Sequence, residues 1–229
     1  MDRKKFLKSG LIGVGAIVAI PTLISFGKKE SDTIDPDACI VSPSETAGPF
    51  PIKTPADWVR ENIVGNREGV PLLIRIKIEN TNDDCKPLSN VLVDIWQCDA
   101  KGNYSEYSRQ LDGNFKKEHF LRGRQTTDEN GYVSFISIYP GWYPGRAPHL
   151  HLEIKNKSDK SLLITQTALP EHVSREVYNT QNYKDRGLFD TSNKRDYEFR
   201  DSLKRSIATS VTGNVTDGFT LTETIKVAG

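Results

Sequence analysis

The sequence predicts an all-β fold, a β-sandwich of mostly antiparallel strands with long loops and little helix. Short runs of alternating apolar and polar residues recur along the chain, and they end at clusters of Asn, Asp, Gly or Pro. Long segments with the apolar spacing of an amphipathic helix are rare. Many short strands separated by turns are typical of two sheets packed on one core.

The first predicted strand contains Ile74, Ile76 and Ile78, which alternate with charged residues and therefore indicate one buried face. The sequence Glu-Asn-Gly at 129–131 predicts a turn before the next strand. Further strands are expected at 91–95, 132–138, 149–155, 162–169 and 219–227, with a hairpin loop at 214–218.

Only two segments are candidates for helices, residues 171–183 and residues 194–207. In the second segment Phe199 and Leu203 fit one face of a helix. The alternation over 207–211 fits a strand equally well, so the sequence leaves this choice open.

The charge balance limits the kinds of partner. The chain has 229 residues, with 31 Lys and Arg against 30 Asp and Glu, and a formal net charge of +1. This length is sufficient for one domain with a substantial core. A nucleic-acid-binding surface needs a cluster of positive charge, so we expect no nucleic-acid partner.

Residues 1–27 differ from the rest and are expected to be a signal segment or a membrane anchor. The basic string RKKFLK at 3–8 resembles a twin-arginine export signal, with Lys4 in place of the second arginine. The apolar run that follows is shorter than the roughly 20 residues that span a bilayer. Residues 28–38 are expected to be a linker to a domain over 39–229. The protein is therefore expected to be exported, to the periplasm or another extracytoplasmic site, with membrane anchoring as the alternative.

The three cysteines are Cys39, Cys85 and Cys98. In an exported protein two of them can form a disulfide, and the sequence does not choose the pair. If the chain runs straight from Cys85 to Cys98, those two lie too far apart to bond. Three reduced core cysteines are the alternative, and no C-x-x-C spacing of a zinc site is present.

The most specific local pattern is His149-Leu150-His151. Residues two apart on a strand share a face, so both imidazoles are expected to point the same way while Leu150 enters the core. Such a pair either binds a metal or forms a simple hydrogen-bonded pair.

A loop rich in glycine and proline, residues 140–148, precedes this strand and brings Tyr143 and Arg146 beside it. A phenolate is a hard anionic donor that suits ferric iron. Because the ordinary pKa of tyrosine is about 10, the phenol would ionise only with the help of a metal charge.

Three stretches, in order, resemble the intradiol ring-cleavage dioxygenases, the family of catechol and protocatechuate dioxygenases. They are SPSETAGPF at 42–50, VLVDIWQCDAKGNYSEY at 91–107 and RGRQTTDENGYVSFISIYPGWYPGRAPHLHLEI at 122–154. The resemblance extends from about residue 42 to the C-terminus and implies the β-sandwich fold of that family.

The resemblance also implies four ligands of one Fe(III) ion. The tyrosine of the family's G-x-Y falls on Tyr104, and the tyrosine before Pro-Gly-Arg falls on Tyr143. The two histidines fall on His149 and His151. Tyr107 is a second candidate for the first ligand, but it lies outside the G-x-Y.

The activity implied by the resemblance is cleavage of a catechol-type diol by O₂ to a muconate-type diacid. Tyr143 would take up a substrate proton, Arg146 would stabilise anionic intermediates, and Gln166 would orient the reacting groups. The chain departs from the family pattern at Glu45, where glutamine is usual, and at Phe50, where some relatives have tyrosine. These departures leave the preferred ring substituents open.

Two other functions remain as alternatives. A non-catalytic binding module similar to transthyretin-like β-sandwiches would be colourless and would fold without a metal. A zinc hydrolase would use His149, His151 and a carboxylate. The sequence leaves open which catechol is the substrate and whether the chain forms a homo-oligomer.

Overall fold

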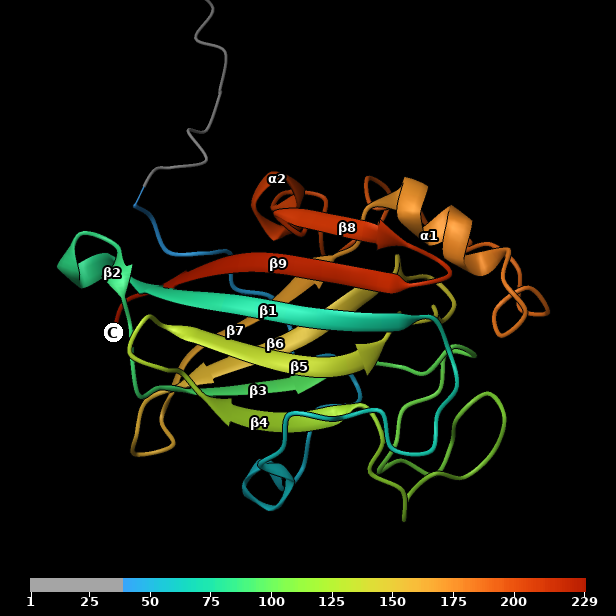
Figure 1. Ribbon diagram of the computed structural model, residues 1–229, viewed down its shortest axis with the longest axis horizontal. Helices are drawn as coiled ribbons and strands as arrows, with labels where there is room; N and C mark the ends of the chain where they lie inside the picture. Colours follow the sequence, from blue (N-terminus) through green and yellow to red (C-terminus); the bar gives the residue numbers. More distant parts are fainter. Residues whose placement is uncertain (1–38) are drawn as a thin grey trace, which may run out of the picture. The chain divides into compact units, whose positions relative to one another are not determined.

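The computed structural model of the protein describes residues 39–229, which form two β-sheets packed face to face (Figure 1). The first sheet contains, in order, β2 (Lys86–Pro87), β1 (Pro71–Asn80), β9 (Gly218–Val227) and β8 (Ser210–Asn214), with β5 (Tyr132–Ile138) also paired to β1. The second contains β4 (Arg122–Thr126), β3 (Leu92–Trp96), β6 (His149–Lys155) and β7 (Ser161–Ala168). The predicted β-sandwich is confirmed.

The core between the sheets follows the predicted alternation. The isoleucines of β1 face it, and the second sheet contributes apolar side chains from β3 and β6. Full burial of one such side chain contributes roughly 1.5–3 kcal/mol, so this shared core holds both sheets together. The side chains of β1, β3 and β6 that face this core include Ile74, Ile76, Ile78, Val93, Ile95, Leu150, Leu152 and Ile154.

One pairing joins the first and the last strand of the sandwich. β1 and β9 run parallel, with Ile74 opposite Leu221, whereas all other pairings between the named strands are antiparallel. The last strand therefore completes the sheet that the first strand begins.

The strand predictions for β1, β3, β5, β6, β7 and β9 are confirmed, and the hairpin loop at 214–218 joins β8 to β9. β4 was not predicted, because Arg122 and Arg124 interrupt any apolar alternation. Both arginines are nevertheless buried, since protein acceptors rather than water satisfy their charges.

The two candidate helical segments contain less helix than their lengths allow. The first candidate ends early, because α1 (Glu171–Tyr178) is followed by turns. The second candidate is wrong except for one turn, α2 (Leu203–Ser206). The Asp196 carboxylate accepts backbone N–H groups of Ala147 and Glu198, and these bonds hold that stretch in an irregular conformation. Two short 3₁₀ helices, η1 (Pro55–Trp58) and η2 (Thr81–Asp83), complete the elements.

A disulfide joins Cys39 to Cys85, and Cys98 is a free, buried thiol. The disulfide attaches the start of the described chain to the turn between β1 and β2. The expected signal segment at 1–27 and linker at 28–38 lie outside the described residues. Within residues 39–229, no helix is both long and apolar enough to cross a membrane.

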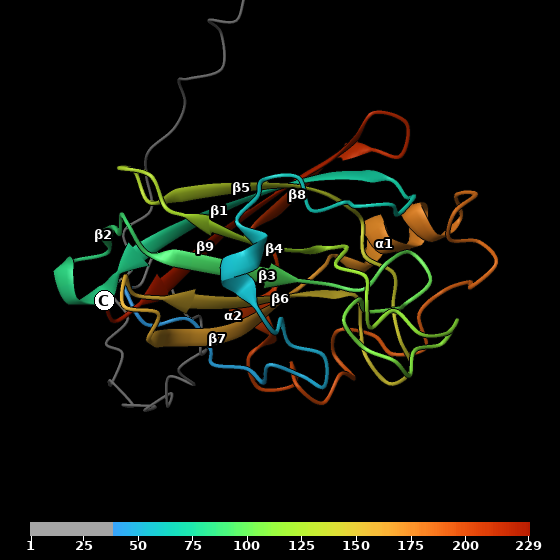
Figure 2. The same cartoon turned by 90° about the horizontal axis from the view of Figure 1, so that it is seen from below.

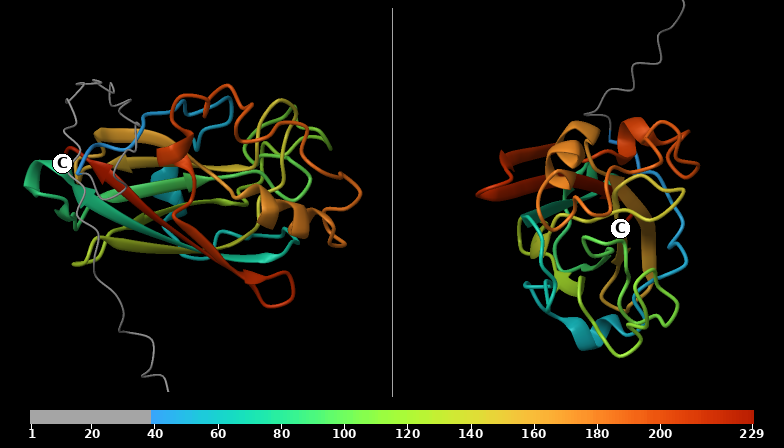
Figure 3. Two further views of the ribbon diagram at one scale, coloured as in Figure 1. Left: turned by 90° about the horizontal axis from the view of Figure 1, so that it is seen from above. Right: turned by 90° about the vertical axis from the view of Figure 1, so that its right-hand side faces the viewer.

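The long loops gather at one end of the sandwich, where β3 and β5 end and β6 begins (Figures 2 and 3). They are the segments 97–121, 139–148 and 179–202. The tyrosines and histidines identified in the sequence meet at this end.

Candidate metal centre

The two histidines lie on the outer face of β6, as the sequence predicted. Leu150 between them is fully buried in the core, while His149 Nε2 lies 3.0 Å from His151 Nε2. The Trp96 ring of β3 stacks on His151 with 5.2 Å between ring centroids and nearly parallel planes. Pairing of β3 with β6 places Trp96 directly opposite His151, so the sheet register fixes the imidazole.

Two tyrosines complete the cluster. The Tyr143 hydroxyl lies 3.4 Å from His149 Nε2, and the Tyr104 ring centroid lies 5.7 Å from that of Tyr143 and 6.1 Å from that of His151. A metal ion with bonds of about 2 Å holds neighbouring donor atoms roughly 3 Å apart. The measured separations around His149 therefore suit donors that share one ion.

A glycine allows the two tyrosine-bearing loops to touch. Gly102 has φ of +88°, and a Cβ there would lie 2.3 Å from the backbone oxygen of Trp142. Only glycine tolerates both the backbone conformation and this approach. The contact brings the loop of Tyr104 against the loop of Tyr143.

Burial sets the protonation of all four side chains. It raises the pKa of Tyr143 to about 12, an effect that Arg146 partly offsets, and it raises the pKa of Tyr104 well above its ordinary value. It lowers the pKa of His149 to about 3 and that of His151 well below its ordinary value. The imidazoles are therefore neutral, as metal binding requires, whereas the phenols need a nearby cation to ionise.

Two observations test whether a metal fits these residues. His149 Nδ1–H donates to the Ala147 carbonyl at 2.6 Å, which leaves the lone pair of Nε2 facing the cluster. The buried hydroxyl of Tyr104 has no hydrogen-bond partner of acceptable geometry within residues 39–229. A buried polar group left unpaired costs about 1–3 kcal/mol, and coordination would remove that cost. The donor set fits a metal ion.

Arg146 lies beside Tyr143 and is fixed from three directions. Its Nε donates to both carboxylate oxygens of Asp196 at 3.0 and 2.9 Å, its Nη1 to the Tyr143 hydroxyl at 3.2 Å, and its Nη2 to Gln166 Oε1 at 2.6 Å. Gln166 in turn donates to the Thr46 carbonyl at 2.7 Å. The three predicted residues Tyr143, Arg146 and Gln166 therefore form one network, and Asp196, which no sequence signal identified, anchors it.

The N-terminal segment 42–53 crosses the cluster. Gly48 has φ of +68°, and a Cβ there would lie 2.9 Å from the His151 ring, so the backbone passes directly over this histidine. Phe50 follows, with its ring 5.0 Å from that of Tyr104 and 6.4 Å from that of Tyr143. Glu45, the departure from the family pattern, instead accepts a hydrogen bond from Ser202 at 2.5 Å.

Other candidate ligands are engaged elsewhere. The Tyr107 hydroxyl donates to the Pro51 carbonyl at 2.8 Å. The described part of the chain contains no group of three or more His, Cys, Asp or Glu side chains able to hold a metal. Among residues 39–229, no carboxylate joins His149 and His151 in the way that the zinc alternative needs.

Comparison with known proteins gives the family. A family model described as dioxygenase matches residues 48–177, more than half of the chain. The structure of an intradiol ring-cleavage dioxygenase from Tetranychus urticae is similar to this one, with 31% sequence identity and a TM-score of 0.73. The similarity covers 82% of this chain and 95% of the other. This protein belongs to the intradiol ring-cleavage dioxygenases.

Two curated relatives of this dioxygenase agree with the assignment. The protocatechuate 3,4-dioxygenase beta chain of Burkholderia cepacia is 33% identical over 113 residues, which cover 45% of this chain and 48% of the relative. The catechol 1,2-dioxygenase of Candida albicans is 36% identical over 75 residues, which cover 33% of this chain and 23% of the relative. The chain thus spans less than half the length of either curated relative.

Proposed function

We propose that this dioxygenase binds one ferric ion through Tyr104, Tyr143, His149 and His151, and cleaves a catechol-type diol between its two hydroxylated carbons. The products of the reaction with O₂ would be muconate-type diacids. One observation carries the proposal: the buried Tyr104 hydroxyl, which has no hydrogen bond of acceptable geometry among the described residues, lies in a cluster with Tyr143 and two neutral imidazoles. Bound there, the ion would supply Lewis acidity and draw electron density from the substrate.

The charge of the donor set supports iron in its ferric state. Two phenolates and two neutral imidazoles provide two negative charges and hard oxygen donors, which suit a trivalent ion. The names of the two curated relatives, a protocatechuate and a catechol dioxygenase, support a catechol-type substrate.

Tyr143 is placed to accept a substrate proton. A catechol must lose both hydroxyl protons before its ring becomes electron-rich enough to react. Burial raises the pKa of Tyr143 to about 12, which favours the protonated phenol whenever the side chain is not bound to the ion. Arg146 donates to the same hydroxyl at 3.2 Å and holds it in position while the proton moves.

Arg146 and Gln166 provide a fixed electrostatic environment. Asp196 holds the Arg146 guanidinium on one side and Gln166 holds it on the other. A preorganised donor aimed at developing negative charge is worth about 2.7–4 kcal/mol in enzymes that have been tested by mutation. We assign this role to Arg146, with Gln166 as the group that orients it.

The direct test is the visible spectrum and iron content of the full-length protein. We expect one iron per chain and a burgundy colour from charge transfer between tyrosinate and Fe(III), and we expect anaerobic catechols to perturb that band. A protein that remains colourless after loading with ferric iron would exclude Tyr104 and Tyr143 as ligands. It would favour the non-catalytic binding module.

We also propose that the protein is exported. A basic start followed by an apolar run is typical of signal segments, and the Cys39–Cys85 disulfide suits an oxidising compartment. Fractionation of cells that express the full-length chain tests this proposal. Recovery of the protein in the cytoplasm with both cysteines reduced would contradict it.

A further inference from the structure

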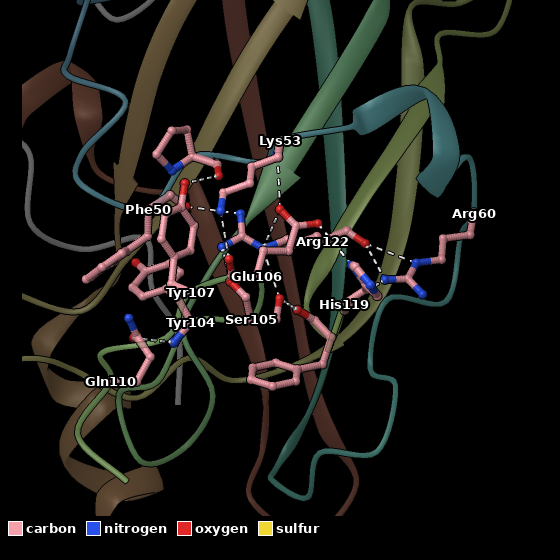
Figure 4. A network of polar contacts seen from close by, with 12 residues as sticks. Phe50, Lys53, Arg60, Tyr104, Ser105, Glu106, Tyr107, Gln110, His119 and Arg122 are labelled. Carbon is pink, nitrogen blue, oxygen red and sulfur yellow. Dashed lines mark hydrogen bonds and ion pairs between the residues drawn. The ribbon is translucent and has the colours of Figure 1, made fainter. Parts of the chain in front are cut away.

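Arg122, the first residue of β4, is fully buried, yet its side chain makes no hydrogen bond to the four donor residues. Figure 4 shows it between Phe50 and the loop that carries Ser105 and Glu106. Its guanidinium donates through Nε to Ser105 Oγ at 2.9 Å, through Nη2 to the Ser105 carbonyl at 2.7 Å, and through Nη1 to the Phe50 carbonyl at 3.0 Å. A buried charge is costly unless its donors are matched. Here the matching acceptors belong to the loop of Tyr104 and to the N-terminal segment.

The loop beside Tyr104 is held in an unusual conformation. Glu106 has φ of +68°, a region that residues other than glycine rarely occupy and that must be imposed by surrounding contacts. Its buried carboxylate lies 3.6 Å from Arg122 Nε and accepts the Lys53 backbone N–H at 3.0 Å. The guanidinium also lies 5.9 Å from the Tyr104 ring centroid, within the range of cation–π contacts.

The same loop contacts the N-terminal segment at several points, and Figure 4 labels Phe50, Lys53, Glu106 and Tyr107 among the residues involved. The Tyr107 hydroxyl donates to the Pro51 carbonyl at 2.8 Å, and Lys53 Nζ donates to the Glu106 carbonyl at 2.9 Å. Gly48, which passes over the His151 ring, lies three residues before Pro51 and five before Lys53. The two sides of the cluster are therefore joined through one buried guanidinium and its neighbours.

We propose that Arg122 is a positioning residue that fixes Tyr104, through Ser105, and the segment 48–53 above His151, through the Phe50 carbonyl. The proposal rests on the proposed function in one respect, that Tyr104 is a metal ligand. Arg122 contacts neither metal nor substrate in this role. Its planar fork reaches two chain segments at once, which a lysine cannot do.

The test variant, Arg122→Lys, removes the forked guanidinium and keeps the positive charge. In Arg122→Lys we expect amide hydrogen exchange of residues 48–53 and 104–107 in the metal-free protein to become at least about 10-fold faster, because loss of one or more hydrogen bonds opens both segments. We expect iron affinity to fall about 10- to 100-fold, as it does when groups that orient ligands are lost. The tyrosinate charge-transfer band should shift in wavelength, which a loss of global stability alone would not produce.

Arg124→Lys is the matched control. Arg124 lies two residues along β4, on the same face and also buried, but it pairs with Asp94 and Asp159. Its replacement should leave the band, the iron affinity and the local exchange as in the wild type. Ser105→Ala removes the acceptor of Arg122 Nε, together with the hydrogen bond that the same hydroxyl donates to the Phe120 carbonyl at 2.7 Å. It should give the same changes as Arg122→Lys at a smaller size, so it replaces that variant if the lysine does not fold.

The outcomes separate the two proposals. If Arg122→Lys, or Ser105→Ala in its place, matches Arg124→Lys in exchange, iron affinity and band position, the role of Arg122 is overturned. If the wild type binds iron without a tyrosinate band, the proposed function fails. In that case faster exchange of both segments in metal-free Arg122→Lys, and not in Arg124→Lys, still supports the positioning role, and unchanged exchange overturns it.

Discussion

The outer face of the second sheet carries two groups of buried polar side chains, one at each end of β6. At the far end Asp94 accepts a hydrogen bond from Arg124 Nη2 at 2.6 Å, and Lys155 lies 3.8 Å away. At the near end His149 and His151 lie beside each other and beside two tyrosines, and their polar atoms are not all matched by hydrogen bonds among the described residues. Both groups sit on the same strands with the same alternation.

The difference lies in how the polar atoms are satisfied. Asp94 and its neighbours satisfy one another, so that group is complete and its role is structural. In the group around His151, by contrast, the buried Tyr104 hydroxyl has no hydrogen bond of acceptable geometry within residues 39–229. Buried polar atoms that converge without satisfying one another therefore identify the functional end of the sheet better than burial or charge does.

The substitution His151→Ala is the most direct test of this difference between the two groups. Removing this donor should lower iron affinity by more than about 100-fold, because even the groups that only orient metal ligands are worth 10- to 100-fold. Iron titration monitored by the visible band measures the effect. Normal colour and normal iron stoichiometry in this variant would show that the cluster is not the metal site.

At the other end, Asp94→Ala should destabilise the protein without affecting iron. It leaves Arg124 buried with only the exposed Asp159 as an ion-pair partner, which should lower the free energy of unfolding by about 3 kcal/mol. Urea unfolding of the metal-free protein measures this change. Loss of iron binding in the folded variant would mean that the two groups are coupled and the comparison fails.

Tyr143→Phe sharpens the comparison within the functional group. Three donors remain, so iron should still bind, but turnover of a catechol should fall about 100-fold, as expected when a proton acceptor is lost. Steady-state kinetics measures the change. Tyr132→Phe, on the exposed face of β5, is the control for removing a tyrosine hydroxyl, and equal rates in both variants would exclude the proton role.

Glu223 extends the comparison to a carboxyl whose charged form is disfavoured by burial. Burial raises its pKa from 4.5 to about 8, and Thr209 donates to it. The folded protein therefore keeps this proton up to about pH 8, whereas the unfolded chain loses it near pH 4.5. The free energy of unfolding should fall as pH rises through that window, by about 1.4 kcal/mol between pH 6 and pH 7.

Glu223→Gln should remove this contribution to the pH dependence, because the amide oxygen still accepts from Thr209 and cannot ionise. Urea unfolding of both proteins at pH 6 and pH 7 is the measurement. Parallel pH dependence in the two proteins would mean that Glu223 is ionised in the fold.

The sequence predicted the sandwich well because its strands alternate with a period of two. The same period placed His149 and His151 on one face and Leu150 in the core. It could not predict β4, because Arg122 and Arg124 look like surface residues until their acceptors are known.

The residues of the site differ in how they could be predicted from the sequence. Tyr104 and Gln166 came from the family resemblance, since nothing in their local spacing marks them. Asp196 was missed because it lies in an irregular loop 50 residues from the arginine that it holds. The Cys39–Cys85 pair could not be chosen, because the distance between these residues depends on the path of the N-terminal segment.

That disulfide also determines where a mechanical load on the chain would fall. Cys85 lies between β1 and β2, at the end of the sandwich remote from the loops that carry the tyrosines (Figure 1). Whatever precedes Cys39 is attached at that end, and a pull along the chain is borne by the sulfur–sulfur bond. Reduction would transfer the same pull first to the hydrogen bonds that join Ser42 to Lys226 and Glu45 to Ile164, and then to the segment above His151, so the covalent link shields the centre from such a load.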